Sequence, residues 1–160
     1  MLFKALIIVL FCVIFWQDYK DRMVYWFCYP AVGILGLMIQ LDLLNIYIVL
    51  ANSLINLCLV LTILLILFVY CWTILNIPMI NGAIGVGDIL MIIFLCFCFS
   101  VVVFIVLFVF SLIFSLLLHQ LHKNRSQVNE TVPLAGYMAA FFAIIYCISF
   151  FVEWDSILAY

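Results

Sequence analysis

Long apolar stretches separated by short polar ones make up most of this chain. Four of them cover residues 2–16, 24–41, 46–75 and 133–152, and a fifth, residues 89–118, is interrupted only by three serines. Nearly every position within these stretches is apolar, which is typical of helices surrounded by lipid or by other helices. The pattern therefore predicts an all-α protein.

The stretch 89–118 is about 30 residues long, too long for one comfortable membrane span and short for two. Basic residues collect in cytoplasmic loops and can decide between these readings. Lys20 and Arg22 form one basic cluster, and a second contains His119, His122, Lys123 and Arg125. Both clusters lie on the cytoplasmic side only if an even number of crossings separates them. We therefore expect two short helices with a tight turn near Ser100, and six transmembrane helices in total.

The composition supports an integral membrane protein. Of the 160 residues, 72% are hydrophobic and 8% are charged. At roughly 20 residues per span, about six spans fill the chain, so residues 1–160 are predicted to form a single transmembrane domain. Nucleic acid is excluded as a partner because the net charge is -2 and there are only five basic residues. The seven cysteines are scattered without a Cys-x-x-Cys pair and are interpreted as packing residues.

Two further sets of residues are predicted to pack against neighbouring helices. Gly33 and Gly36 in the second stretch allow close approach. Amides recur at helical spacing along the third stretch and are expected to form hydrogen bonds to other helices; they belong to Asn45, Asn52 and Asn56. In the last stretch, small residues at steps of three and four form a similar face, which comprises Ala135, Gly136, Ala139, Ala140 and Ala143.

Gly85-Val86-Gly87-Asp88 combines two glycines with a carboxylate at the boundary between a loop, residues 76–87, and an apolar stretch. Ionisable residues at such positions mark functional sites more often than not. Asp18 occupies a similar position at the end of the first stretch. Two crossings separate the two aspartates, so both are expected at the cytoplasmic membrane face.

Two carboxylates within hydrogen-bonding distance can share a proton, because both cannot ionise cheaply at close range. One then acts as base toward a water molecule, and the other acts as acid toward the developing oxyanion and the leaving nitrogen. Gly85 and Gly87 would let a substrate backbone or a neighbouring helix approach. Alternatively, the aspartates are capping and solvated residues, Asp88 is a plain N-cap residue, or Asp21 is the partner of Asp18.

Gly85-Val86-Gly87-Asp88 resembles the motif of the GxGD aspartyl proteases, and most of the chain is similar to type IV prepilin peptidases and archaeal preflagellin peptidases. The resemblance implies six transmembrane helices, a first catalytic aspartate at Asp18 and a second at Asp88. Residues 132–136, Val-Pro-Leu-Ala-Gly, also resemble the proline-containing start of the last helix in that family. Residues 24–26, Val-Tyr-Trp, depart from the Ile-Pro-Asn that many members carry. Presenilin and the signal-peptide peptidases share GxGD but are less similar elsewhere.

The resemblance implies an aspartic endopeptidase of the cytoplasmic (inner) membrane that removes the short basic leader of prepilin-like membrane proteins. Only a few residues separate the first two apolar stretches, without a Cys-x-x-Cys pair, so N-methyltransferase activity is not expected. No cofactor is expected either.

Two other functions are compatible with membrane carboxylates. A proton-coupled transporter would be expected to carry charges near mid-bilayer and repeated halves, neither of which is evident. A non-catalytic membrane subunit would use both aspartates only for packing or solvation. His119 and His122 are interpreted as interfacial residues rather than metal ligands, because Glu130 lies several residues away in a loop.

Overall fold

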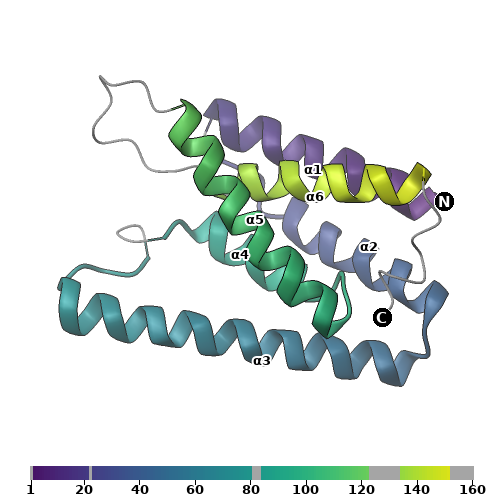
Figure 1. Cartoon of the computed structure of the whole chain (residues 1–160), viewed down its shortest axis with the longest axis horizontal. Helices are drawn as coiled ribbons and strands as arrows, with labels where there is room; N and C mark the ends of the chain where they lie inside the picture. Colours follow the sequence, from purple (N-terminus) through teal and green to yellow (C-terminus); the bar gives the residue numbers. More distant parts are fainter. Residues whose placement is uncertain (1, 22, 81–83, 123–133, 152–160) are drawn as a thin grey trace.

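The computed structural model describes residues 2–21, 23–80, 84–122 and 134–151 (Figure 1). All named elements in these ranges are helical: α1 (Leu2–Asp21), α2 (Cys28–Leu43), α3 (Ile46–Tyr70), the π-helical turn η1 (Cys71–Leu75), α4 (Val86–Leu95), α5 (Val101–His122) and α6 (Leu134–Phe151). The prediction of an all-α fold is confirmed for this part of the chain.

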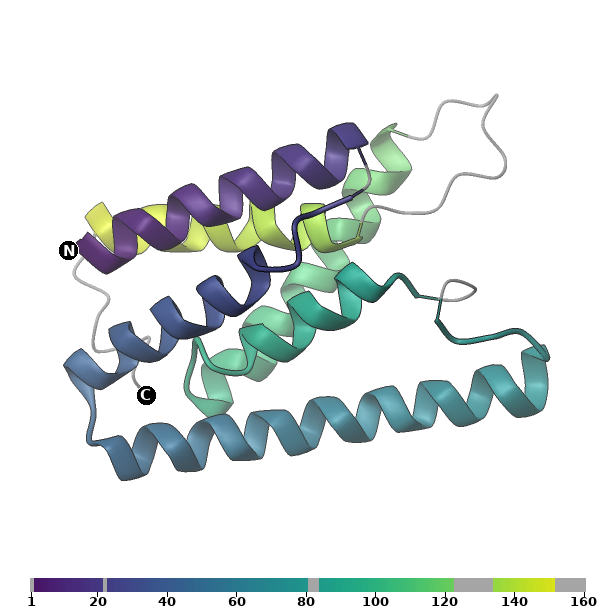
Figure 2. The ribbon, with the colours of Figure 1, turned by 180° about the vertical axis from the view of Figure 1, so that it is seen from behind.

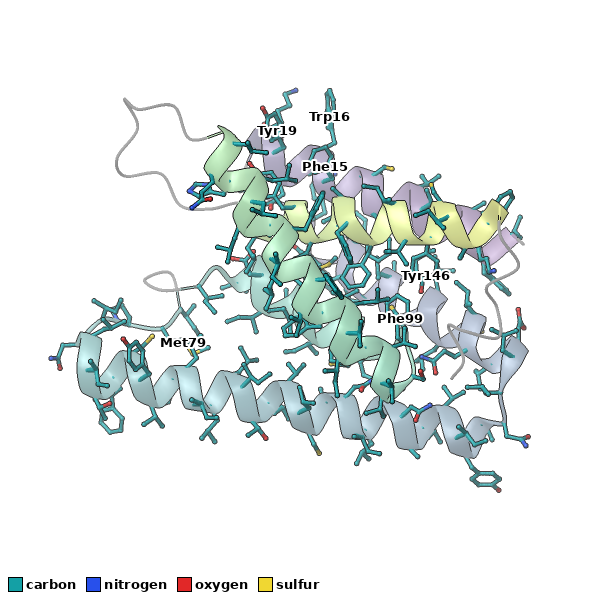
Figure 3. All side chains as sticks on the ribbon, in the orientation of Figure 1. Phe15, Trp16, Tyr19, Met79, Phe99 and Tyr146 are labelled. Carbon is teal, nitrogen blue, oxygen red and sulfur yellow. The ribbon has the colours of Figure 1, made fainter. Side chains whose placement is uncertain are left out.

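Helices α1 and α6 lie side by side and antiparallel (Figures 1 and 2). The ring of Phe142 on α6 stacks on Phe11 of α1, with centroids 5.9 Å apart, and on Phe99, at 5.5 Å. Phe99 and Tyr146 lie together in the interior of the bundle (Figure 3). The predicted small-residue face of α6 is largely buried, at Ala135, Gly136, Ala139 and Ala143. It lets α1 approach closely, as expected.

Helix α1 is longer than predicted. The apolar stretch 2–16 led us to expect a helix end at the charged residues, but α1 continues to Asp21. Polar residues at a membrane boundary do not interrupt backbone hydrogen bonding, and Lys20 in the last turn interacts favourably with the helix dipole. Asp18 therefore lies within the last turns of α1.

Helix α2 begins at Cys28, four residues later than the apolar pattern suggested. The connection before it is held by a hydrogen bond from the backbone N–H of Tyr25 to Oε1 of Gln17, at 3.2 Å. Helix α3 and η1 together cover the predicted range 46–75 without a break. Asn76 then ends the helical segment with a left-handed φ of 53°, a conformation that asparagine tolerates better than most residues.

The stretch 89–118 contains two helices separated by a turn, as predicted, because α4 ends at Leu95 and α5 begins at Val101. Only α4 is short, however, with 10 residues against 22 in α5. Apolar residues continue without a breaker as far as residue 118, so nothing in the sequence stops α5 earlier. The turn itself is buried at Cys96, Cys98, Phe99 and Ser100.

Asn56 of α3 holds this turn. Its side-chain amide is fully buried and donates to the carbonyl oxygens of Cys96, at 3.1 Å, and Phe99, at 2.9 Å. The predicted interhelical hydrogen bonding is thus confirmed for Asn56. Of the other two asparagines, Asn45 is exposed at the start of α3 and Asn52 is half-buried.

Helix α2 runs beside α4 (Figure 2), and its glycines lie against α4 and the turn that follows it. A Cβ atom on Gly33 would be 2.8 Å from the ring of Phe94, and one on Gly36 would be 2.4 Å from Sγ of Cys98. Any larger residue would force the two helices apart. The predicted close packing at Gly33 and Gly36 is confirmed.

In the part of the chain that the structure describes, three helical segments are long and apolar enough to span a membrane: Leu2–Asp21, Ile46–Leu75 and Val101–Leu121. The remaining helices, α2, α4 and α6, are apolar but shorter. Large apolar side chains cover the outer surface, and α3 exposes more than half of Leu65 and Ile66. Trp16 projects from α1 away from the bundle (Figure 3). Such a surface suits a lipid environment.

Candidate active site

Asp18 and Asp88 meet at the N-terminus of α6. The backbone N–H of Gly136 donates to Oδ2 of Asp18 at 2.5 Å, and the backbone N–H of Ala135 donates to Oδ1 of Asp88 at 2.7 Å. The two donors belong to consecutive residues, so carboxylates 70 positions apart in the sequence are held side by side. Both aspartate side chains are half-buried.

The start of α6 is suited to hold negative charge. The first amides of a helix have no partner within it, and the helix dipole places partial positive charge there. Ala135 and Gly136 carry almost no side chain, so the carboxylates reach the amides. At Gly136 this is a strict requirement, since a Cβ atom would lie 2.8 Å from Oδ2 of Asp18.

Asp88 also stabilises the start of its own helix. Its Oδ2 accepts a hydrogen bond from the backbone N–H of Gly85, the N-cap residue of α4, at 3.3 Å. The N-cap residue of α4 is therefore Gly85 and not Asp88, which caps the helix with one oxygen from the third helical position, while its other oxygen accepts from Ala135 of α6. These bonds fix the orientation of the carboxylate relative to Asp18.

The two glycines of the motif have different surroundings. Gly87 lies against Tyr29 of α2, because a Cβ atom there would be 2.7 Å from the tyrosine hydroxyl. A side chain of a neighbouring helix therefore lies close to Gly87. Gly85 is exposed, and within the described residues a Cβ atom there would meet atoms of Asp88. Approach of a substrate backbone at Gly85 and Gly87 stays a prediction.

Tyr29 is a residue of this site that sequence reasoning missed. Its side chain is 2% exposed, and its hydroxyl lies against Gly87, the residue that precedes Asp88. The number of membrane crossings that places both aspartates at one membrane face also places the start of the second helix there. The sequence therefore contained a signal for Tyr29. It was weak, because Tyr29 is one of eight tyrosines in an aromatic-rich chain.

Other candidates lie apart from the pair. Asp21 is exposed at the end of α1 and takes no part in the hydrogen bonds to α6. His119 is half-buried near the end of α5, whereas the side chain of His122 and all of Glu130 lie outside the described residues. Within the described ranges, no group of three or more His, Cys, Asp or Glu residues is arranged to hold a metal ion.

The chain matches no protein-family model, and no curated protein or solved structure is significantly similar to it. The resemblance to GxGD proteases therefore rests on the motif residues. The adjacency of the two aspartates is a separate observation that does not depend on it.

Proposed function

We propose that this protein is a membrane-embedded aspartic endopeptidase in which Asp18 and Asp88 form the catalytic pair. The observation that carries the proposal is the binding of both carboxylates to the consecutive amides of Ala135 and Gly136. Capping of α4 requires only Asp88, and it gives no reason for a second carboxylate from α1 at the same helix end. Paired carboxylates in a partly buried site are the arrangement that water-activating aspartic proteases need.

In the proposed reaction the pair shares one proton. The ionised carboxylate takes a proton from water as the water oxygen attacks the peptide carbonyl carbon, and the protonated carboxyl donates its proton to the developing oxyanion. A proton is then transferred to the leaving nitrogen as the C–N bond breaks. The amides of α6 hold the two carboxylates in register, which reduces the reorganisation that the reaction requires.

The proposed substrate is a prepilin-like membrane protein with a short basic leader, cleaved at the cytoplasmic face of the inner membrane. Cleavage next to an apolar helix fits a site at one end of a bundle whose outer surface is apolar. Six helices embedded in the bilayer are part of this proposal. The connection between α1 and α2 has only a few residues, so we propose peptidase activity without N-methyltransferase activity.

The test is co-expression with a tagged substrate that has a lysine-rich leader followed by an apolar helix. Asp18→Asn and Asp88→Asn should each reduce leader removal by about 10²-fold or more, because each removes one of the two proton-transfer groups. Asp21→Asn, a matched change three residues from Asp18, should cleave normally. Normal processing by either pair variant would favour the non-catalytic subunit instead. If the wild type cleaves no substrate and both variants lose proton-coupled solute uptake, the result would favour the transporter.

A further inference from the structure

Tyr29 is the third polar side chain at the aspartate pair. It lies in the first turn of α2, which makes it the contribution of a fourth helix to a site otherwise built from α1, α4 and α6. Its burial is nearly complete, at 2% exposure. A tyrosine placed for packing alone would not need to bury its hydroxyl at the start of the helix that carries Asp88, where the polar group has to be desolvated.

The hydroxyl is held against the first turn of α4. A Cβ atom on Gly87 would be 2.7 Å from the Tyr29 oxygen but 3.7 Å from the ring carbon that carries it. The close approach therefore involves the hydroxyl rather than the ring. Gly87 directly precedes Asp88, so the absence of a side chain there lets the hydroxyl reach the catalytic end of α4.

A tyrosine hydroxyl can donate one hydrogen bond and stays protonated at neutral pH. Beside two carboxylates that share a proton, such a donor favours the ionised form of whichever oxygen it bonds. The backbone amides of Ala135 and Gly136 donate one hydrogen bond to each aspartate, and the amide of Gly85 donates a second one to Asp88. A single tyrosine hydroxyl can bond to only one of the two carboxylates, so it would also act on them unequally.

We propose that Tyr29 is a positioning residue of the aspartate pair: its hydroxyl donates a hydrogen bond to one carboxylate and keeps it ionised to accept the proton of the attacking water. This inference rests on the proposed peptidase function. It assigns a residue outside the GxGD motif to the same reaction.

The experiment uses the full-length protein in detergent with a fluorogenic peptide that carries a lysine-rich leader and an apolar helix. Tyr29→Phe should lower kcat by about 10- to 100-fold, the effect of losing a hydrogen bond to a charged group, with KM changed by less than about twofold. Gly87→Ala should lower kcat similarly, because the new methyl group displaces the hydroxyl. Adding Gly87→Ala to Tyr29→Phe should cost little more, since phenylalanine has no hydroxyl to displace.

Tyr146→Phe is the matched control, because Tyr146 is also fully buried but lies far along α6 beside Cys98. It should retain the wild-type kcat. A Tyr29→Phe kcat within twofold of wild type, or an equal loss in Tyr146→Phe, overturns the inference and leaves the proposed function standing. If Tyr29→Phe does not fold, Gly87→Ala decides alone, and a retained kcat overturns the inference. Absence of cleavage by the wild type overturns both proposals.

Discussion

Gly136 is the residue at which one added methyl group acts directly on the candidate site. A Cβ atom there would lie 2.8 Å from Oδ2 of Asp18 and 3.0 Å from its Cβ. We expect Gly136→Ala to lower the free energy of unfolding by about 1–3 kcal/mol, as overpacking does, and to reduce cleavage by displacing Asp18. Thermal unfolding in detergent and the cleavage assay measure the two effects.

Ala140→Val is the control for Gly136→Ala. It also adds side-chain atoms to α6, but at a half-buried position away from the aspartates. The free energy of unfolding should fall by less than in Gly136→Ala, because Ala140 is only half-buried. Equal effects of the two substitutions would mean that α6 tolerates no added volume anywhere, and that the contact with Asp18 is not special.

The sequence predicted the aspartates but not the groups that hold them. Asp18 and Asp88 stand out because a carboxylate beside an apolar stretch is rare, and counting crossings brings them to the same end. The amides of Ala135 and Gly136 have no comparable signal, since every residue except proline carries a backbone N–H. Their role depends on where α6 starts relative to α1 and α4, which is a result of packing.

Helix α4 is held at both ends by hydrogen bonds to other helices. At its start, Asp88 accepts from Ala135 of α6, and beyond its end Asn56 of α3 donates to Cys96 and Phe99. A helix of 10 residues rises about 15 Å, roughly half the thickness of a hydrocarbon core. Because its own length leaves its position in a bilayer undetermined, α4 depends on these bonds for its placement.

Asn56→Leu tests this dependence. Leucine has a similar volume but cannot donate, so two buried carbonyl oxygens lose their partner. The free energy of unfolding should fall by about 1–3 kcal/mol, and cleavage should fall with it because Asp88 is carried by the same helix. Asn52→Leu, on the same helix but only half-buried, should change both quantities little. Unchanged thermal unfolding of Asn56→Leu would show that the turn does not need these bonds.

Helix boundaries were predicted less well than helix order. The range of α3 with η1 and the break near Ser100 follow directly from apolar length and from charge placement. The C-terminal end of α1 and the length of α5 do not, because polar side chains at a helix end can remain in water while the backbone continues its hydrogen bonding. Apolar length therefore predicts where a helix crosses lipid better than where it ends.

At the scale of the whole molecule, the site lies at the end of the bundle where α1 finishes and α6 begins. The proposed orientation puts this end in the cytoplasm, with the basic clusters. Single cysteines can test it in a variant that lacks the native ones. Met23 is exposed at the end of the bundle that holds the site, so Met23→Cys should react with a membrane-impermeant thiol reagent only after permeabilisation. Tyr47 is exposed at the start of α3, so Tyr47→Cys should react with the same reagent in intact cells.

The two positions form an internal comparison, because they lie before and after α2. Labelling of Met23→Cys in intact cells, with protection of Tyr47→Cys, would invert the orientation and place the aspartates outside the cytoplasm. A leader peptide that is still in the cytoplasm could not then be the substrate. Labelling of both in intact cells would show that α2 does not cross the bilayer.

The hydrogen bond between Gly136 and Asp18 joins residues 118 positions apart. During synthesis, α1 through α5 leave the ribosome before the amides that hold the aspartates exist as part of a helix. Until α6 inserts beside α1, neither carboxylate has its α6 donor, and the pair has no common support. Assembly of the site is therefore tied to completion of the bundle, so that a partly synthesised chain carries both acidic residues in the membrane without the arrangement that makes them a pair.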